Sequence, residues 1–171
     1  MGRRASPDGM SAPGAPGVIG LISDTHGLVR PEVHTALAGV SVILHAGDVG
    51  GDAVLEELAL IAPVHAVFGN TDPTDARGLR AELVHQVGDI RIHVSHGHEL
   101  GVPTPAALRE RYPYDVIVYG HTHRPLIERA RGQLVVNPGA AGPRRFDVRP
   151  TVARLSILAG HAAVELIPLD S

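Results

Sequence analysis

Five short polar clusters in this chain each closely follow a short apolar run, and this order constrains the fold more than any other feature. The clusters are Asp24-Thr25-His26, Gly47-Asp48, Gly69-Asn70, His96-Gly97-His98 and Gly120-His121-Thr122-His123. The apolar runs that precede them are residues 18–22, 42–44, 64–68, 90–94 and 116–119. Such runs predict buried strands, and sites in open α/β sheets form beyond the carboxyl ends of the strands. The clusters are therefore expected to meet at one edge of a sheet and form one centre.

The clusters carry the ligand types that bind transition metals. The chain has 11 histidines and no cysteine, so a metal would be held by imidazole nitrogen and by oxygen. Asp24 and His26 are two residues apart at a strand end and point the same way, and His121 and His123 share that spacing. The seven candidate ligands are Asp24, His26, Asp48, Asn70, His96, His121 and His123. Seven are too many for one ordinary site and suit two neighbouring ions that share a carboxylate.

The ligand chemistry also narrows the choice of metal. Mixed imidazole and carboxylate sets suit Mn, Fe, Zn, Co or Ni better than Mg or Ca. Each motif alone is weak evidence, because D-x-H and H-x-H occur by chance and a lone Gly-Asp is usually a turn. Five placements at strand ends in a cysteine-free chain are hard to obtain from packing needs. His45 stands at an odd offset from Asp48 and is expected to be a packed or supporting histidine on the other face.

The length and composition set the outer bounds. A chain of 171 residues fits one domain with a sizeable core. Residues 1–16, rich in Gly, Pro, Ala and Ser, are expected to form a disordered tail, and residues 17–171 a single domain. The net charge of −3 and the lack of a long basic run argue against an extended nucleic-acid footprint. No apolar run is long enough to cross a bilayer, and a cytoplasmic location is expected.

Local patterns predict a change of architecture along the chain. In the first half, strand signals alternate with helices at residues 31–38 and 52–61, the second capped by Asp52, which predicts a largely parallel sheet. A further helix is expected from Pro105 to Arg111, after Thr104. The second half otherwise predicts hairpins, at residues 82–86 with 90–95, 126–130 with 134–137, and 151–158 with 161–167. We expect two mixed sheets packed face to face with helices outside, and mostly antiparallel strands in the second half of the chain.

The whole series of motifs resembles the calcineurin-like metallophosphoesterases, and within them the small bacterial and archaeal phosphodiesterases. It reads Asp24-x-His26, Gly47-Asp48, Gly69-Asn70-x-Asp72, His96-Gly97-His98, Gly120-His121-x-His123 and Asn137-Pro138-Gly139. The resemblance runs from about Val18 to the end of the chain. It implies a four-layer α/β/β/α sandwich with a dinuclear site. In that site Asp48 would bridge two ions, one also held by Asp24, His26 and His123, the other by Asn70, His96 and His121.

One position departs from the family pattern. Many larger members carry a histidine directly after the motif asparagine, where it protonates the leaving group or binds the phosphate. Here that position is Thr71, and threonine cannot act as a general acid near neutral pH. Asp72 matches the acidic position of the motif and is expected to orient a neighbour. His98 is the next candidate for a catalytic contact with the substrate phosphate.

The expected function is hydrolysis of a small phosphodiester, which could be derived from a nucleotide, by a hydroxide that bridges two divalent metal ions. Manganese is the first expectation, with iron, zinc, nickel and cobalt as alternatives. One rival is a non-catalytic scaffold of the same fold that binds protein partners, although all seven ligand positions are intact. Another is a metallohydrolase for amides or lactones, but its H-x-H-x-D-H signature is absent because Arg124 follows His123. Assembly into a homo-oligomer is left open.

Overall fold

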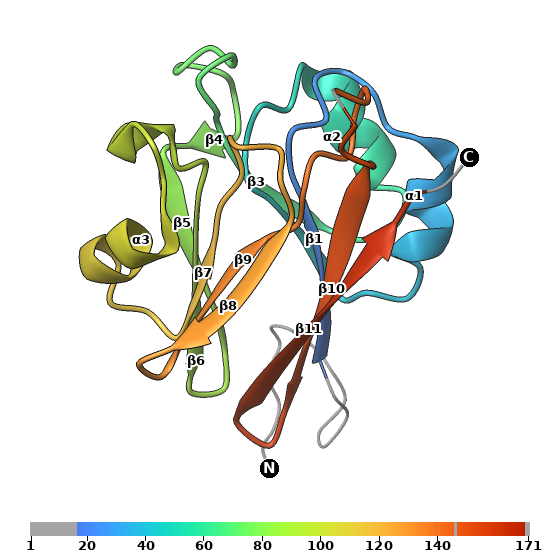
Figure 1. The fold of residues 1–171 in the computed structure, drawn as a ribbon. Helices are drawn as coiled ribbons and strands as arrows, with labels where there is room; N and C mark the ends of the chain where they lie inside the picture. The colour runs from blue at the N-terminus through green and yellow to red at the C-terminus, as the bar shows by residue number, and fades with distance from the viewer. Residues whose placement is uncertain (1–16, 146, 170–171) are drawn as a thin grey trace.

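The computed structural model describes residues 17–145 and 147–169, which form two β-sheets packed face to face (Figure 1). The predicted tail, residues 1–16, lies outside the described residues. The first sheet has the strand order β11 (His161–Pro168), β10 (Thr151–Leu158), β1 (Gly17–Ile22), β2 (Val42–His45), β3 (Val64–Val67) and β4 (Leu79–Arg80). The second has the order β5 (Glu82–Val87), β6 (Ile90–Ser95), β7 (Val116–Val118), β9 (Gln133–Asn137) and β8 (Leu126–Ala130).

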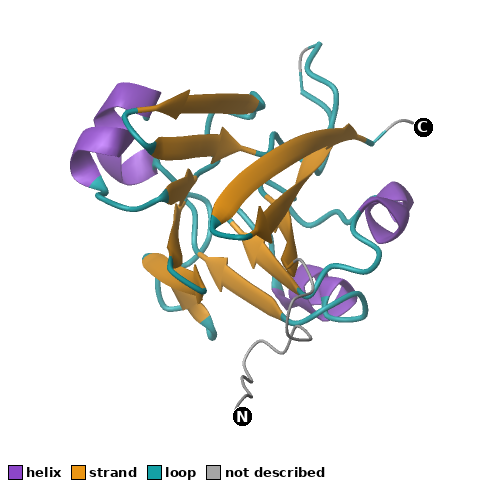
Figure 2. Ribbon diagram, turned by 90° about the horizontal axis from the view of Figure 1, so that it is seen from below, coloured by secondary structure: helices purple, strands orange, loops and turns teal. Residues whose placement is uncertain are grey.

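Helices cover the outer faces of the two sheets and complete four layers (Figure 2). They are α1 (Pro31–Ala36), α2 (Asp52–Leu58), α3 (Pro105–Arg111) and the short 3₁₀ turn η1 (His98–Leu100). Alternate strand residues face different cores, because successive side chains point to opposite sides of a strand. Leu44 and Val118 pack between the sheets, whereas Ile43 packs with α1 and α2, and Ile117 packs with Leu108 of α3. The predicted α/β/β/α sandwich is confirmed.

The strand pairing confirms that both sheets are mixed. The three predicted hairpins are present, but β6 pairs with β7, and β7 with β9, in parallel. The second sheet therefore contains both parallel and antiparallel pairs, as expected. The hairpin of β10 and β11 instead joins the first sheet, where β10 lies antiparallel to β1. Hairpins follow from local turn chemistry, whereas the partner of each hairpin depends on contacts between segments far apart in the sequence.

The helix ends show one side-chain cap and one predicted cap that was wrong. Thr104 accepts a hydrogen bond from the Ala107 N–H at 3.2 Å and caps α3, the helix that was expected to begin there. The cap position of α2 is occupied by Gly51, at φ 120°, and not by Asp52. Asp52 is the first helical residue, where a carboxylate still interacts favourably with the helix dipole. No helix within residues 17–145 and 147–169 is long and apolar enough to cross a membrane.

Candidate metal centre

The loops that follow five strands meet at one edge of the sandwich. The loops after β1 and β2 are joined by backbone hydrogen bonds from Asp24 N–H to the Gly47 carbonyl, 2.9 Å, and from His26 N–H to the Asp48 carbonyl, 3.0 Å. The loops after β6 and β7 are joined by the Gly120 N–H and the His96 carbonyl, at 2.9 Å. Parallel strands place their carboxyl ends on the same side within each sheet, and the 2.8 Å contact between His96 Nδ1 and the Ala46 carbonyl joins the loops of the two sheets. The five polar clusters are thus gathered as the sequence predicts.

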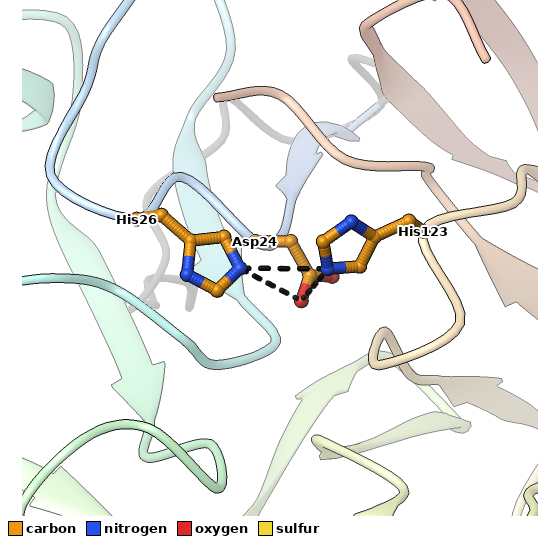
Figure 3. A group of neighbouring side chains, drawn as sticks. All are labelled: Asp24, His26 and His123. Carbon is orange, nitrogen blue, oxygen red and sulfur yellow. Dashed lines mark hydrogen bonds and ion pairs between the residues drawn. The ribbon is translucent and has the colours of Figure 1, made fainter. Parts of the chain in front are cut away.

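A first group of side chains consists of Asp24, His26 and His123 (Figure 3). The Nε2 atoms of the two histidines lie 3.4 Å apart. Asp24 Oδ1 lies 3.3 Å from His123 Nε2 and 3.9 Å from His26 Nε2. One donor atom of each residue lies within 4.8 Å of the others, which is close enough for all three to bind one cation.

A second group lies directly beside the first and contains Asp48, Asn70, His96 and His121. His96 Nε2 lies 3.3 Å from Asp48 Oδ2 and 3.0 Å from Asn70 Oδ1. Asn70 Oδ1 also lies 3.2 Å from His121 Nδ1. All seven predicted ligands therefore lie in one cluster, and their division between two ions stays a prediction.

Two carboxylates stand between the groups. Asp48 Oδ2 lies 3.7 Å from His26 Nε2, in addition to its contact with His96 in the second group. Asp24 Oδ1 similarly approaches His96 Nε2, at 3.8 Å. Asp48 and Asp24 are 3% and 0% exposed, so water does not screen their charges. Either carboxylate can face two cations, and Asp48 remains our expected bridge.

The backbone at the ligands adopts an unfavourable conformation. Five ligands have positive φ angles: Asp24 at 55°, His26 at 46°, Asp48 at 55°, His121 at 71° and His123 at 65°. This left-handed conformation costs an L-residue about 1–2 kcal/mol and persists only where the surroundings enforce it. Such strain clusters at functional sites, because the conformation that places a ligand correctly is seldom the most stable one.

Asp72 supports the loops that carry Asp48 and Asn70. Its carboxylate accepts hydrogen bonds from the N–H groups of Val49, Gly50 and Gly69, at 3.0, 3.1 and 2.9 Å. All three donors are backbone N–H groups of the loops after β2 and β3. Its place in the structure is that of an orienting residue between two loops.

His98 lies at the rim of the cluster. Its ring centroid is 5.4 Å from that of His96 and 6.3 Å from that of His121. Its side chain is 30% exposed, and its Nδ1 is buried without a hydrogen-bond partner. The neighbouring Glu99 holds this loop, since its carboxylate accepts hydrogen bonds from the Tyr112 hydroxyl, 2.6 Å, and the Gly97 N–H, 3.0 Å. His98 is therefore available to a substrate beside the candidate ligands.

The cluster changes the protonation of its own members. Burial alone would raise the pKa of Asp48, but hydrogen bonds with His96 and with the Thr71 N–H hold that pKa well below its ordinary value. Burial lowers the pKa of His26 and of His121. For His96 burial acts in the same direction, but the hydrogen bond with Asp48 and the charge of Asp24 raise its pKa overall. Asp48 thus stays ionised at neutral pH, and His26 and His121 tend to remain neutral, as metal ligands must.

The packing around the ligands is close. A Cβ atom added at Gly69 would overlap the Asp48 carboxylate and backbone. Ser23 donates a hydrogen bond to Asp24 Oδ2 at 2.6 Å, and the His121 N–H donates to the same oxygen at 3.2 Å. The other oxygen, Asp24 Oδ1, is buried and has no hydrogen-bond partner.

The donor set fits bound divalent cations. An unpartnered buried carboxylate oxygen is costly unless a positive group completes it. Here that oxygen points at two imidazole nitrogens that face each other, an arrangement whose lone pairs a cation would satisfy. Imidazole, carboxylate and amide donors in this proportion suit first-row transition metals.

Sequence reasoning missed two of the residues that support the candidate ligands, Ser23 and Thr25. Thr25, which stands between two ligands, hydrogen-bonds His45, whose role was left open between packing and support. Ser23 and Thr25 share their clusters with ligands, but no spacing rule separates a supporting hydroxyl from an exposed one. The only available signal was their position beside Asp24.

The fold and the cluster of candidate metal ligands both agree with one superfamily of phosphoesterases. Residues 18–160 match the family model of the calcineurin-like phosphoesterase superfamily domain, and the chain belongs to this superfamily. Probable metallophosphoesterase MJ0623 of Methanocaldococcus jannaschii is 32% identical to it over 163 residues, covering 90% of this chain and 82% of the relative. Phosphodiesterase MJ0936 of the same organism is 30% identical over 144 residues, covering 71% of this chain and 82% of the relative.

Solved structures agree with the fold. The crystal structure of Vps29 from Entamoeba histolytica complexed with Zn²⁺ has a TM-score of 0.69 at 22% identity and covers 90% of this chain and 99% of its own. At this level of identity, the likeness concerns the fold alone.

Proposed function

We propose that this protein is a metal-dependent phosphodiesterase with a dinuclear centre. Asp24, His26 and His123 hold one ion in this proposal. Asn70, His96 and His121 hold the other, and Asp48 bridges the two. Mn²⁺ is the first expected metal, followed by Fe, Zn, Ni or Co.

The observation that carries the proposal is a buried oxygen, Asp24 Oδ1, which has no hydrogen-bond partner and lies 3.3 to 3.9 Å from the imidazoles of His26, His96 and His123. The family membership supports phosphoester hydrolysis, and the relative named as a phosphodiesterase supports a diester. The zinc-bound Vps29 structure supports metal binding by this fold. The ligand set contains only two carboxylates, so the centre with two divalent ions is net positive and attracts a phosphate.

The metal ions and the surrounding side chains have separate roles in this proposal. Two divalent ions held here would lower the pKa of a water molecule between them and stabilise charge on the phosphate during in-line displacement. Asp48 and Asp24 fix the spacing of the centre, and Asp72 keeps the Asp48 and Asn70 loops in register. His98 contacts a phosphate oxygen from the rim.

The leaving group receives little help from the protein. Thr71 donates its N–H to Asp48 Oδ1 at 2.9 Å, and its side chain supplies no acid near neutral pH. We therefore expect good leaving groups such as nitrophenolate to depart fastest.

A panel of metals and substrates tests the proposal. Purified protein, stripped with chelator and reloaded with Mn²⁺, Fe²⁺, Zn²⁺, Ni²⁺ or Co²⁺, is assayed on a nitrophenyl phosphodiester, a phosphomonoester, a cyclic nucleotide and a lactone. We expect metal-dependent turnover with the highest kcat/KM on a diester. Faster hydrolysis of the monoester or lactone would contradict the proposed substrate class. Metal binding without any turnover would favour the non-catalytic scaffold.

A further inference from the structure

His45 at the end of β2 forms a continuous hydrogen-bond chain between two ligand loops. The side chain is completely buried. Its Nδ1 accepts a hydrogen bond from the Gly47 N–H at 3.0 Å, and its Nε2 lies 2.9 Å from Thr25 Oγ1. The Thr25 hydroxyl in turn donates to the Val49 carbonyl at 2.7 Å. These contacts reach the residue between two candidate ligands on one loop and both neighbours of Asp48 on the other.

The hydrogen-bond directions leave one tautomer of His45. Because Nδ1 accepts from a backbone N–H, it carries no proton, and a neutral imidazole then has its proton on Nε2. That proton is donated to Thr25, and the threonine hydrogen remains free for Val49. Burial lowers the pKa of His45 to about 4, so the neutral ring persists at physiological pH. An apolar side chain at this position could make neither hydrogen bond.

The two loops that these hydrogen bonds join have strained backbones. Asp24, His26 and Asp48 all have left-handed φ angles, between 46° and 55°. Such conformations survive only where neighbouring groups enforce them. His45 and Thr25 supply side-chain contacts to both loops, whereas Asp72 supplies them between the Asp48 loop and the next one.

We propose that His45 is a positioning residue of the metal centre, which acts through Thr25 to hold the loops after β1 and β2 in their metal-binding conformation. This inference rests on the metal centre of the proposed function, and it adds a role for two residues outside the ligand set. Outer groups that orient ligands typically contribute about 10–100-fold to metal affinity. A residue that only fills space would contribute to folding without such an effect on affinity.

The test measures metal affinity rather than activity. Chelator-stripped protein is titrated with Mn²⁺ in competition with a fluorescent chelator, and thermal unfolding of each variant confirms the fold. Thr25→Val removes the hydroxyl and keeps the shape, whereas Thr25→Ser keeps the hydroxyl. His45→Asn keeps an acceptor near the Gly47 N–H but is too short to reach Thr25. His65→Asn, on an exposed residue of β3, is the matched histidine control.

We expect Thr25→Val and His45→Asn each to weaken Mn²⁺ binding by about 10–100-fold. Thr25→Ser and His65→Asn should bind as the wild type does. The double variant His45→Asn with Thr25→Val should bind no more weakly than the worse single variant, because both changes remove the same hydrogen bond. Nitrogen-15 NMR of the His45 ring should show its proton on Nε2.

Unchanged affinity in a folded Thr25→Val protein would overturn the inference, and so would fully additive losses in the double variant. If His45→Asn does not fold, the comparison of Thr25→Val with Thr25→Ser decides, because it leaves His45 in place. A wild-type protein that binds Mn²⁺ but hydrolyses no phosphodiester would contradict the proposed function and leave the positioning role intact.

Discussion

At the scale of single residues, Asp48 bears the largest share of the proposed chemistry because its carboxylate faces both ligand groups. Asp48→Ala should therefore be the most damaging ligand change, with kcat/KM reduced by at least about 100-fold, beyond the loss typical of outer groups. Metal content should fall in parallel. The measurement is kcat/KM on a nitrophenyl diester together with metal analysis of the same sample.

The control for this change is Asp52→Ala, at the exposed start of α2. It removes the same charge outside the cluster and should retain wild-type activity and metal content. Near-wild-type activity and metal content in Asp48→Ala would show that the ligand assignment is wrong.

Thr71 tests the origin of the leaving-group preference. Thr71→His should raise kcat/KM most for a diester with a poor alkyl leaving group and little for one with nitrophenolate, because only the poor leaving group needs a proton. General acid catalysis is worth about 10²–10⁴-fold when well placed. Both substrates are compared in wild type and variant at matched metal loading. Equal effects on both substrates would mean that position 71 does not govern protonation.

The candidate ligands could be named from the sequence, because each stands one to five residues beyond the end of a strand. The supporting contacts could not. Asp72 binds three backbone N–H groups from two loops, and His45 reaches Thr25 across two strands. Asp72 is 3 to 23 residues from its partners in the sequence, and His45 is 20 residues from Thr25. These contacts form only after the loops have come together in the fold.

At the scale of elements, the hairpins were predictable because they depend on residues that are adjacent in the sequence. The turns at Arg131-Gly132 and Ala159-Gly160 both have positive φ angles, as two-residue hairpin turns require, and both hairpins form as expected. The short strand β4 and the placement of β10 beside β1 were not foreseen. A two-residue strand has no period, and sheet order depends on packing between distant segments.

The close approach of two strand ends gives a test at this scale. Gly69→Ala would push the loop after β3 away from Asp48, because the new Cβ has no space. A displacement of about 1 Å in a catalytic group can cost about 100-fold in rate, so we expect kcat/KM to fall by about that factor while the protein stays folded. Steady-state kinetics and circular dichroism provide the measurement.

Gly39→Ala is the matched control. Gly39 follows α1, has a φ of +82° and has nothing within 4 Å of an added Cβ. This change should lower the free energy of unfolding by about 1–2 kcal/mol and leave kcat/KM unchanged. A Gly69→Ala protein with wild-type kinetics would contradict the close packing of Gly69 against Asp48.

At the scale of the whole molecule, His45 links stability to pH. Its pKa is about 4 in the folded protein, below the ordinary value of 6.5, so the unfolded chain takes up the proton first as the pH falls. The contribution of the neutral ring is present above about pH 6.5 and is lost as the pH falls toward about 4. Between about pH 7 and pH 5, the free energy of unfolding should fall by about 2 kcal/mol more in metal-free wild type than in His45→Asn. Urea unfolding at both pH values measures this difference, and parallel pH profiles would contradict it.

The central claim is that two metal ions at the meeting point of the five loops hydrolyse a phosphodiester. Its most direct test is a metal titration of chelator-stripped protein, with bound Mn²⁺ and turnover of a nitrophenyl diester recorded in the same samples. We predict no turnover in excess chelator, and a rate that rises with bound metal until two ions are held per chain. Undiminished turnover by protein with no metal bound at the cluster would contradict this claim.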